Sequence, residues 1–281
     1  MAYKSLLTVA TSPDGLDASV TAAAALAIRN DAHLDALALG VDRTQVGYSY
    51  VGSGAVIIAA AMDRAEDDAR AAEKGLNAAI AAQPPGLRVA VETAVCQLGA
   101  LTDVVASRAR YADLVVLPRP YGKGNGVEAE AVVEAALFNG MAPVLIVPAK
   151  GMANTDPRRI VLAWNQSREA LVATRRAMPF LKRADSVSIV VIDPPAHGPE
   201  RSDPGGLLCQ FLVRHGVHAE VTVLAKTMPR VSDILARHLR DIDADLLVMG
   251  AYGHSRLREA ILGGATRDML EAAEVPVFLA H

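Results

Sequence analysis

The chain repeats one pattern of residues, and this repetition constrains its fold more than any single motif does. Three pairs of segments match in the same order: residues 5–19 with 159–173, residues 91–118 with 221–250, and residues 142–148 with 275–281. In the middle pair, Asp103 matches Asp233 and the run "ADLVV" matches "ADLLV". Three matches in one order indicate the tandem duplication of a domain.

Each copy alternates between strand-like and helix-like apolar patterns. In the second copy the patterns predict strands near residues 159–164, 187–192, 219–225, 245–249 and 275–280. They predict helices near residues 168–182, 205–215, 230–242 and 265–273. Pro179 should bend or end the first of these helices. Strands that are apolar on both faces and separated by helices predict an α/β fold, with a parallel sheet covered on both sides in each copy.

The segment between the copies marks a domain boundary. The stretch "AKGMANTDPRR", residues 149–159, has the small, polar and proline content of a linker. We therefore expect one domain over residues 1–149 and a second over residues 155–281, a size that suits a chain of 281 residues. The first copy also carries a longer insert at about residues 42–62.

Composition and charge argue against several functions. Hydrophobic residues make up 52% of the chain and aromatic residues 4%, which favours helices on an aliphatic sheet over an aromatic-rich β-sandwich. The 28 basic and 31 acidic residues are dispersed, so nucleic-acid binding is disfavoured. The longest apolar run, residues 54–62, is far shorter than the ~20 residues that span a bilayer. With two cysteines that lack CxxC spacing, these features predict a cytoplasmic protein that binds no membrane.

The stretch "GAYGHSRLREAILGGATRDML", residues 250–270, follows a predicted buried strand and leads into a predicted helix. Ligands of open α/β sheets bind at the carboxyl ends of strands, and a helix N-terminus attracts anions. Glycines there allow the backbone to approach a phosphate, yet glycines are also ordinary turn residues. From spacing alone, an anion site and a pair of structural turns both stay open. The stretch contains neither GxGxxG nor the Gly-Lys-Ser/Thr of a P-loop, which argues against dinucleotide redox chemistry and P-loop hydrolysis.

These residues carry a family resemblance: the whole chain resembles a tandem universal stress protein, with two copies of the UspA-type domain. Nucleotide-binding members of that family carry Gly-x2-Gly-x9-Gly-Ser/Thr, and Gly250, Gly253 and Gly263 fit that spacing, with Gly264 at the Ser/Thr position. The resemblance implies a five-stranded parallel sheet per domain, of the Rossmann-like, adenine nucleotide alpha hydrolase-like class. It also implies ATP, with or without magnesium, bound with its phosphates on this loop and its adenosine near the ends of the first two strands.

The nucleotide site implied by the resemblance draws on three segments of the second copy. Its residues are Ala163, Trp164, Asn165, Val191, Met249, Gly250, Gly253, His254, Arg256, Gly263, Gly264, Ala265 and Thr266. Gly264 lacks the hydroxyl of the family motif, and Asn165 replaces a common Asp; the loss of both contacts would weaken binding about tenfold without abolishing it. Trp164 has two open interpretations, as a wall of the adenine pocket or as a core residue.

The first copy departs from the motif. Pro118 and Arg119 replace its opening, and Glu128 and Glu130 lie near the expected helix start, where carboxylates would repel a phosphate. We therefore expect a degenerate domain without nucleotide. Lys123 lies among glycines, but no Lys-Ser/Thr follows it, and a flexible surface loop is the favoured interpretation.

Other chemistry finds less support in the sequence. The seven histidines lack ligand spacing, so His238 is expected at the surface, while His254 in the glycine stretch is open between phosphate contact and turn. Asp241, Asp243 and Asp245 resemble a cation cluster but fit better as a polar connection between a helix and a strand. No nucleophile motif appears, and the metal content of the protein stays unknown.

The expected function is that of a universal stress protein, a stress-response regulatory protein that binds ATP in its second domain. The two domains are expected to pair about a pseudo-two-fold axis through "PVLIV" and "PVFLA", which leaves a further homodimer open. Two alternatives are a nucleotide-free interaction module of the same fold and a weak ATPase. The enzyme ranks last because the sequence offers no general base or metal-binding carboxylate set. The stress signal, the protein partner and the choice among ATP, ADP and AMP are not predicted.

Overall fold

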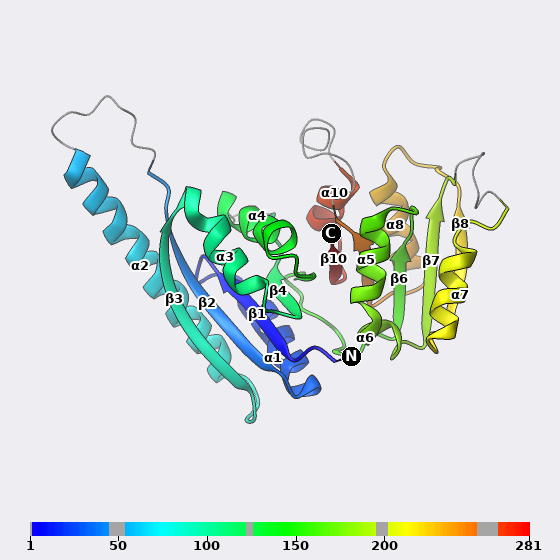
Figure 1. Cartoon of the computed structure of the whole chain (residues 1–281), viewed down its shortest axis with the longest axis horizontal. Coiled ribbons are helices and arrows are strands. Elements are labelled where there is room, and N and C mark those ends of the chain that lie inside the picture. Colours follow the sequence, from blue (N-terminus) through cyan, green and yellow to red (C-terminus); the bar gives the residue numbers. More distant parts are fainter. Residues whose placement is uncertain (1, 45–53, 122–125, 195–201, 252–263) are drawn as a thin grey trace. The chain divides into compact units, whose positions relative to one another are not determined.

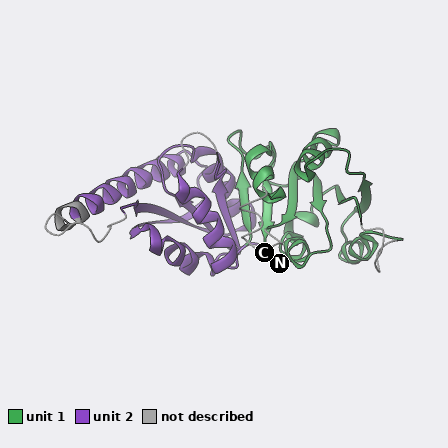
Figure 2. Ribbon diagram, turned by 90° about the horizontal axis from the view of Figure 1, so that it is seen from above, with its two compact units in different colours: residues 1–2, 143–281 green, residues 3–142 purple. Residues whose placement is uncertain are grey.

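The computed structural model describes residues 2–44, 54–121, 126–194, 202–251 and 264–281. The chain divides into two compact units, residues 3–142 and residues 143–281 together with residues 1–2 (Figure 2). Each unit is an α/β layer structure built on a largely parallel sheet (Figure 1). The predicted fold class is therefore confirmed, and the domain limits at 149 and 155 stay a prediction.

The second unit contains the second copy of the repeat. Its elements are β5 (Val144–Val147), β6 (Arg159–Ala163), α5 (Arg168–Arg176), α6 (Met178–Leu181), β7 (Ser186–Ile192), α7 (Gly206–Arg214), β8 (Ala219–Leu224), α8 (Val231–Asp241), β9 (Leu246–Gly250), α10 (Ala265–Ala272) and β10 (Val277–Ala280). The strand order is β5-β10-β9-β6-β7-β8. The pairs β6·β7, β7·β8, β6·β9 and β9·β10 are parallel. This is the predicted five-stranded parallel sheet.

One strand of the second unit comes from the first copy. β5 pairs antiparallel with β10, with Leu145 opposite Phe278. The two strands are "VLIV" and "VFLA", all of whose residues are buried. The pairing gives β10 a neighbour on the side away from β9, so its edge is covered.

The first unit contains the rest of the first copy. Its elements are β1 (Ser5–Ala10), α1 (Asp17–Asn30), β2 (His33–Asp42), α2 (Gly54–Ala81), β3 (Arg88–Gln97), η1 (Leu98–Ala100), α3 (Leu101–Ala109), β4 (Leu114–Pro118), α4 (Val127–Glu134) and η2 (Ala135–Asn139). Its strands run parallel in the order β3-β2-β1-β4. The predicted insert includes the start of the long helix α2. None of the helices in the described ranges is long and apolar enough to cross a membrane.

Local sequence explains where the elements of the second unit begin and end. Leu247 and Val248 of β9 are completely buried, as expected of a strand covered on both faces. Ser167 caps α5 by accepting a hydrogen bond from the Ala170 backbone N–H at 3.1 Å. Pro179 follows at the start of α6, after α5 has ended at Arg176, so the predicted break is confirmed.

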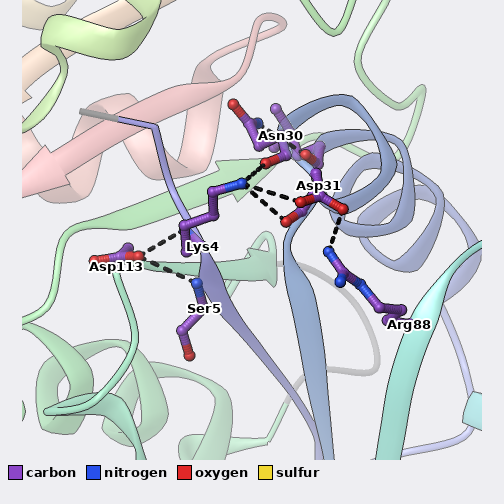
Figure 3. A network of polar contacts seen from close by, with 7 residues as sticks. Lys4, Ser5, Asn30, Asp31, Arg88 and Asp113 are labelled. Carbon is purple, nitrogen blue, oxygen red and sulfur yellow. Dashed lines mark hydrogen bonds and ion pairs between the residues drawn. The ribbon is translucent and has the colours of Figure 1, made fainter.

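An aspartate just before a central strand holds the start of the neighbouring strand in each unit. Asp245 Oδ2 accepts the backbone N–H groups of Arg158 and Arg159 at 2.6 Å and 2.9 Å. Asp113 Oδ2 accepts those of Lys4 and Ser5 at 2.7 Å and 3.1 Å (Figure 3). Asp113 and Asp245 are equivalent positions of the repeat, "ADLVV" and "ADLLV". We call this arrangement the aspartate clamp.

In the first unit, Lys4 extends the clamp to the end of a helix. The Lys4 ammonium donates to the carbonyl oxygens of Asn30 and Asp31, at 2.8 Å and 3.1 Å, and forms an ion pair with the Asp31 carboxylate (Figure 3). Asp31 is the left-handed C-cap of α1, with φ of 49°. A cation at a helix C-terminus satisfies carbonyl oxygens that lack helical partners. The same side chain therefore joins the start of β1 to the end of α1.

The aspartate clamp generates a stability prediction. Asp245→Ala removes a charged acceptor from two backbone N–H groups, so we expect the free energy of unfolding to fall by about 1.5–3 kcal/mol, measured by urea denaturation. The matched control is Asp241→Asn, which removes the exposed ion pair to Arg237 and a charge near His238, and at about pH 8, where His238 is neutral, should cost less than about 0.5 kcal/mol. Equal losses in the two variants would show that the clamp adds nothing beyond surface charge.

Candidate functional site

The strand order of the second unit creates a topological switch point between β6 and β9. β6 is followed along the chain by β7, its neighbour on one side, while its neighbour on the other side is β9. The connections after β6 and β9 therefore leave in opposite directions, and ligands of open α/β sheets bind outside the carboxyl ends of such strands. The first unit has the same arrangement at β1 and β4.

The structure gathers the predicted strand-end residues at this position. Ala163 ends β6 and is aligned with Val190 of β7, one residue before Val191. Met249 and Gly250 end β9, and Leu162 is aligned with Val248. The site residues from three strands, far apart in sequence, thus share one edge of the sheet.

Trp164 follows β6 directly and is held in place by its backbone. Its N–H donates to the Val190 carbonyl at 2.9 Å, which extends the β6·β7 pairing by one residue. The side chain is half-buried, and its Cδ1 lies 3.6 Å from the point where a Cβ on Gly205 would be. The indole thus packs against protein at the carboxyl end of β6, and its role as a wall of an adenine pocket stays a prediction.

Asn165 forms the turn between β6 and α5. It is exposed, and its Oδ1 accepts the Ser167 backbone N–H at 3.1 Å. This local bond is an Asx turn, and it precedes the Ser167 cap of α5. The amide oxygen is therefore committed to shaping the turn, a role that an Asp at this position would also serve.

Gly250 has a packing role that the sequence did not reveal. A Cβ at this position would lie 2.5 Å from the Ala170 backbone nitrogen and 2.7 Å from the Glu169 carbonyl carbon. The first turn of α5 therefore approaches the end of β9 backbone to backbone. The glycine is required by this contact alone, whether or not a ligand is present.

The helix that follows the glycine stretch begins as expected. Gly264 is the N-cap of α10 and has an extended backbone, with φ of −67° and ψ of 149°. Ala265 is the first helical residue, and Thr266 is buried in the first turn. Asp268, also in that turn, accepts a hydrogen bond from Ser232 of α8 at 3.2 Å. The other four predicted site residues lie outside the described residues; they are Gly253, His254, Arg256 and Gly263.

A model of the universal stress protein family matches residues 157–281. This part of the chain belongs to that family. A universal stress protein from Synechocystis sp. (strain ATCC 27184 / PCC 6803 / Kazusa) is 27% identical over 144 residues, which make up 48% of this chain and 45% of that protein. The chain thus matches less than half the length of this curated relative.

A solved structure shares the fold of the chain as a whole. A universal stress protein from Archaeoglobus fulgidus DSM 4304 covers 100% of this chain and 96% of its own, with a TM-score of 0.70 and 17% identity. A universal stress protein in complex with cAMP covers 45% of this chain and 98% of its own, with a TM-score of 0.39 and 20% identity. The first likeness shows that both copies together have a fold found in this family.

The first unit uses the corresponding position differently from the universal stress protein domain. Glu128 lies in the first turn of α4, is 2% exposed and forms an ion pair with Arg43. The hydrogen bond to this carboxylate raises the pKa of Arg43. Glu130, in the same turn, accepts a hydrogen bond from the Tyr121 hydroxyl at 2.7 Å. The predicted carboxylates at the helix start are therefore present. The more buried of the two, Glu128, is paired with Arg43 of the same unit.

Little space is left beside this carboxylate. The hollow at the ends of β1 and β4 measures about 40 Å³, and its lining includes Ala10, Pro118 and Ala129. The hollow that contains Arg43 and Glu128 measures about 190 Å³. Ligand pockets commonly measure ~300–1,000 Å³, so each hollow is small for a nucleotide.

Two carboxylate residues of the acidic run, residues 241–245, shape the backbone around them. Asp245 is the aspartate clamp, and Asp243 turns the chain between α8 and β9 with φ of 47°. The described residues contain no group of three or more His, Cys, Asp or Glu that could hold a metal ion. The preferred interpretation of this acidic run as a helix-to-strand connection is confirmed.

His238 corrects the expectation of a surface histidine. It is half-buried on α8, and its Nε2 lies 3.2 Å from the Ser188 hydroxyl of β7, which also lies 2.9 Å from the Thr222 hydroxyl. The sequence missed this contact because Ser188 and His238 are joined only when α8 packs on the sheet. Burial lowers the pKa of His238, and Asp241 opposes this shift.

The close approach of α5 to β9 generates a prediction for Gly250. Gly250→Ala places a methyl group against backbone atoms that cannot rotate away, so the free energy of unfolding should fall by about 1–3 kcal/mol in urea denaturation. Gly99→Ala is the matched control, because nothing lies within 4 Å of its added Cβ. If Gly250→Ala were as stable as that control, the contact would be looser than described.

The burial of His238 generates a pH prediction. Its pKa is lowered in the folded state, so below about pH 6.5 the unfolded chain takes up the proton more readily and stability falls. We expect the free energy of unfolding to drop more between about pH 7 and about pH 5 in the wild type than in His238→Gln, which retains a hydrogen-bonding side chain. Identical pH profiles of the two proteins would contradict the burial of this histidine.

Proposed function

We propose that the second domain, residues 155–281, binds one adenine nucleotide, ATP with or without magnesium, and acts as a regulatory module rather than an enzyme. The observation that carries the proposal is the position of Gly250. It ends β9 beside β6, where the connections diverge, and it starts the spacing Gly-x2-Gly-x9-Gly that leads into α10. Backbone N–H groups and the dipole of the following helix then favour the phosphates.

The ends of β6 and β7 suit the adenosine in this proposal. Ala163 and Trp164 lie at the same end of the sheet as Gly250, and the aliphatic side chain of Val191 is buried beside them. An apolar wall with a few polar groups is typical of a cofactor site. Asn165 carries no charge, so it offers less to a magnesium ion than an Asp would, which favours slow or no hydrolysis.

The first domain, residues 1–149, is proposed to be free of nucleotide. Glu128 puts a buried negative charge at the helix start that would otherwise receive a phosphate. The antiparallel register of β5 and β10 supports the further proposal that the last strands of the two copies join the domains. Both cysteines are without a disulfide, which fits a reducing compartment such as the cytoplasm.

The test is the nucleotide content of freshly purified protein, followed by calorimetry with ATP and magnesium on the emptied protein. We expect about one nucleotide per chain and a loss of affinity of more than tenfold in Gly263→Val, because a side chain there would block the approach of the backbone to the phosphates. Gly99→Val, in open space far along the chain, is the control and should bind like the wild type.

Each alternative function predicts a different result in these measurements. An empty protein without binding heat at several temperatures would favour the nucleotide-free interaction module. Sustained phosphate release that disappears in Gly263→Val would favour the weak ATPase. Two nucleotides per chain would refute the role assigned to Glu128.

A further inference from the structure

The indole N–H of Trp164 is a buried donor without a partner in the part of the chain that the structure describes. Its Nε1 is shielded from solvent, and no acceptor lies within hydrogen-bonding distance there. The indole nitrogen can only donate. Buried donors are nearly always paired in folded proteins, so an exception calls for a ligand or a water as the missing acceptor.

The described atoms beside one edge of the indole are apolar. A Cβ on Gly205 would lie 3.4 Å from Val191 Cγ2, 3.5 Å from Ile189 Cγ2 and 3.6 Å from Trp164 Cδ1, the atom bonded to Nε1. The Gly205 carbonyl accepts the Cys209 backbone N–H at 2.9 Å, as the first bond of α7. The indole edge therefore lies among aliphatic side chains and a glycine.

Gly205 itself restricts what can stand beside the indole. Its φ of 86° is in the left-handed region, where residues with a side chain are strained. Glycine is therefore favoured at position 205, so the residue beside this edge of the indole has no side chain. A single donor beside apolar atoms suits a neutral heteroaromatic ring better than a phosphate, which would lose its hydration there.

We propose that the Trp164 N–H donates a hydrogen bond to a ring nitrogen of the bound purine, and that Trp164 is thereby a specificity-determining residue of the nucleotide site. The proposal rests on the proposed function and specifies which end of the nucleotide lies at β6 and β7. Adenine presents ring nitrogens that only accept hydrogen bonds, and these match a donor that cannot accept.

The first measurement uses the intrinsic fluorescence of the protein, because Trp164 is the single tryptophan in the chain. Excitation at the red edge of its absorption avoids the nucleotide. We expect saturating ATP to change the tryptophan emission. Inorganic triphosphate, which would bind where the phosphates of ATP bind, should leave the emission unchanged. An equal change with triphosphate would overturn the proposal, since it would put phosphate rather than base at the indole.

The second measurement compares Trp164→Phe with the wild type by calorimetry. The variant keeps an aromatic ring but removes the donor, so ATP affinity should fall about three- to tenfold. Phe also fills less space than the indole, so the ligand-free variant should be less stable, and the affinities are compared at a temperature at which both proteins are folded. Tyr111→Phe, which removes an exposed aromatic hydroxyl from the first unit, is the control and should leave ATP affinity unchanged.

Analogues of ATP in which ring N1, N3 or N7 is replaced by carbon identify the acceptor. One of the three should bind the wild type three- to tenfold more weakly than ATP does and should lose no further affinity in Trp164→Phe. The other two should still lose affinity in the variant. The comparison of ATP with its three analogues on the wild-type protein remains valid even if Trp164→Phe folds poorly.

Failure of the inference and failure of the proposed function give different results. If the wild type binds ATP and Trp164→Phe binds it equally well, the inference is wrong and the nucleotide site stands. If the wild type binds no adenine nucleotide, both are wrong.

Discussion

The aspartate clamp fixes the relation between the two strands on which the candidate site depends. Asp245 precedes β9 and holds the first backbone N–H groups of β6, so the two strands start in a defined register. Because parallel strands rise together, a register set at their amino ends also aligns their carboxyl ends. Trp164 and Gly250 are therefore positioned by an interaction at the opposite edge of the sheet. Asp113 serves the same purpose in the first copy.

The two copies share this framework and differ at one helix start. The first two helical residues of α10 are Ala265 and Thr266, with Asp268 further along its first turn, whereas the second helical residue of α4 is Glu128, paired to Arg43. The dipole at a helix N-terminus attracts a negative charge in either case. In the first copy Glu128 of the protein itself supplies that charge. In the second copy the N-terminus of α10 is compatible with a bound anion. The Glu128 side chain thus explains why we expect a phosphate at the helix start of the second copy and none at that of the first.

Much of the second unit could be predicted from its sequence, because strands buried on both faces have apolar runs that are hard to mistake. The predicted strands and helices match the observed ones to within about two residues at each end, and Pro179 divides α5 from α6 as expected. The contact between Ser188 and His238 could not be predicted, since it depends on which face of α8 meets the sheet. The sequence indicated only part of the role of Gly250, because a glycine at a strand end is compatible with a ligand and also with a closely packed neighbouring helix. Of the glycine stretch itself, only its two ends fall within the described residues.

The approach of α5 to Gly250 has a mechanical consequence. The Ala170 backbone nitrogen lies in the first turn of α5, and no side chain cushions it from the end of β9. This contact is rigid, because backbone atoms cannot move aside by changing rotamer, as side chains can. Any displacement of the β9 terminus is therefore transmitted to α5, which also packs against β10. The end of β9 and the strand that pairs with β5 are in this way connected through α5.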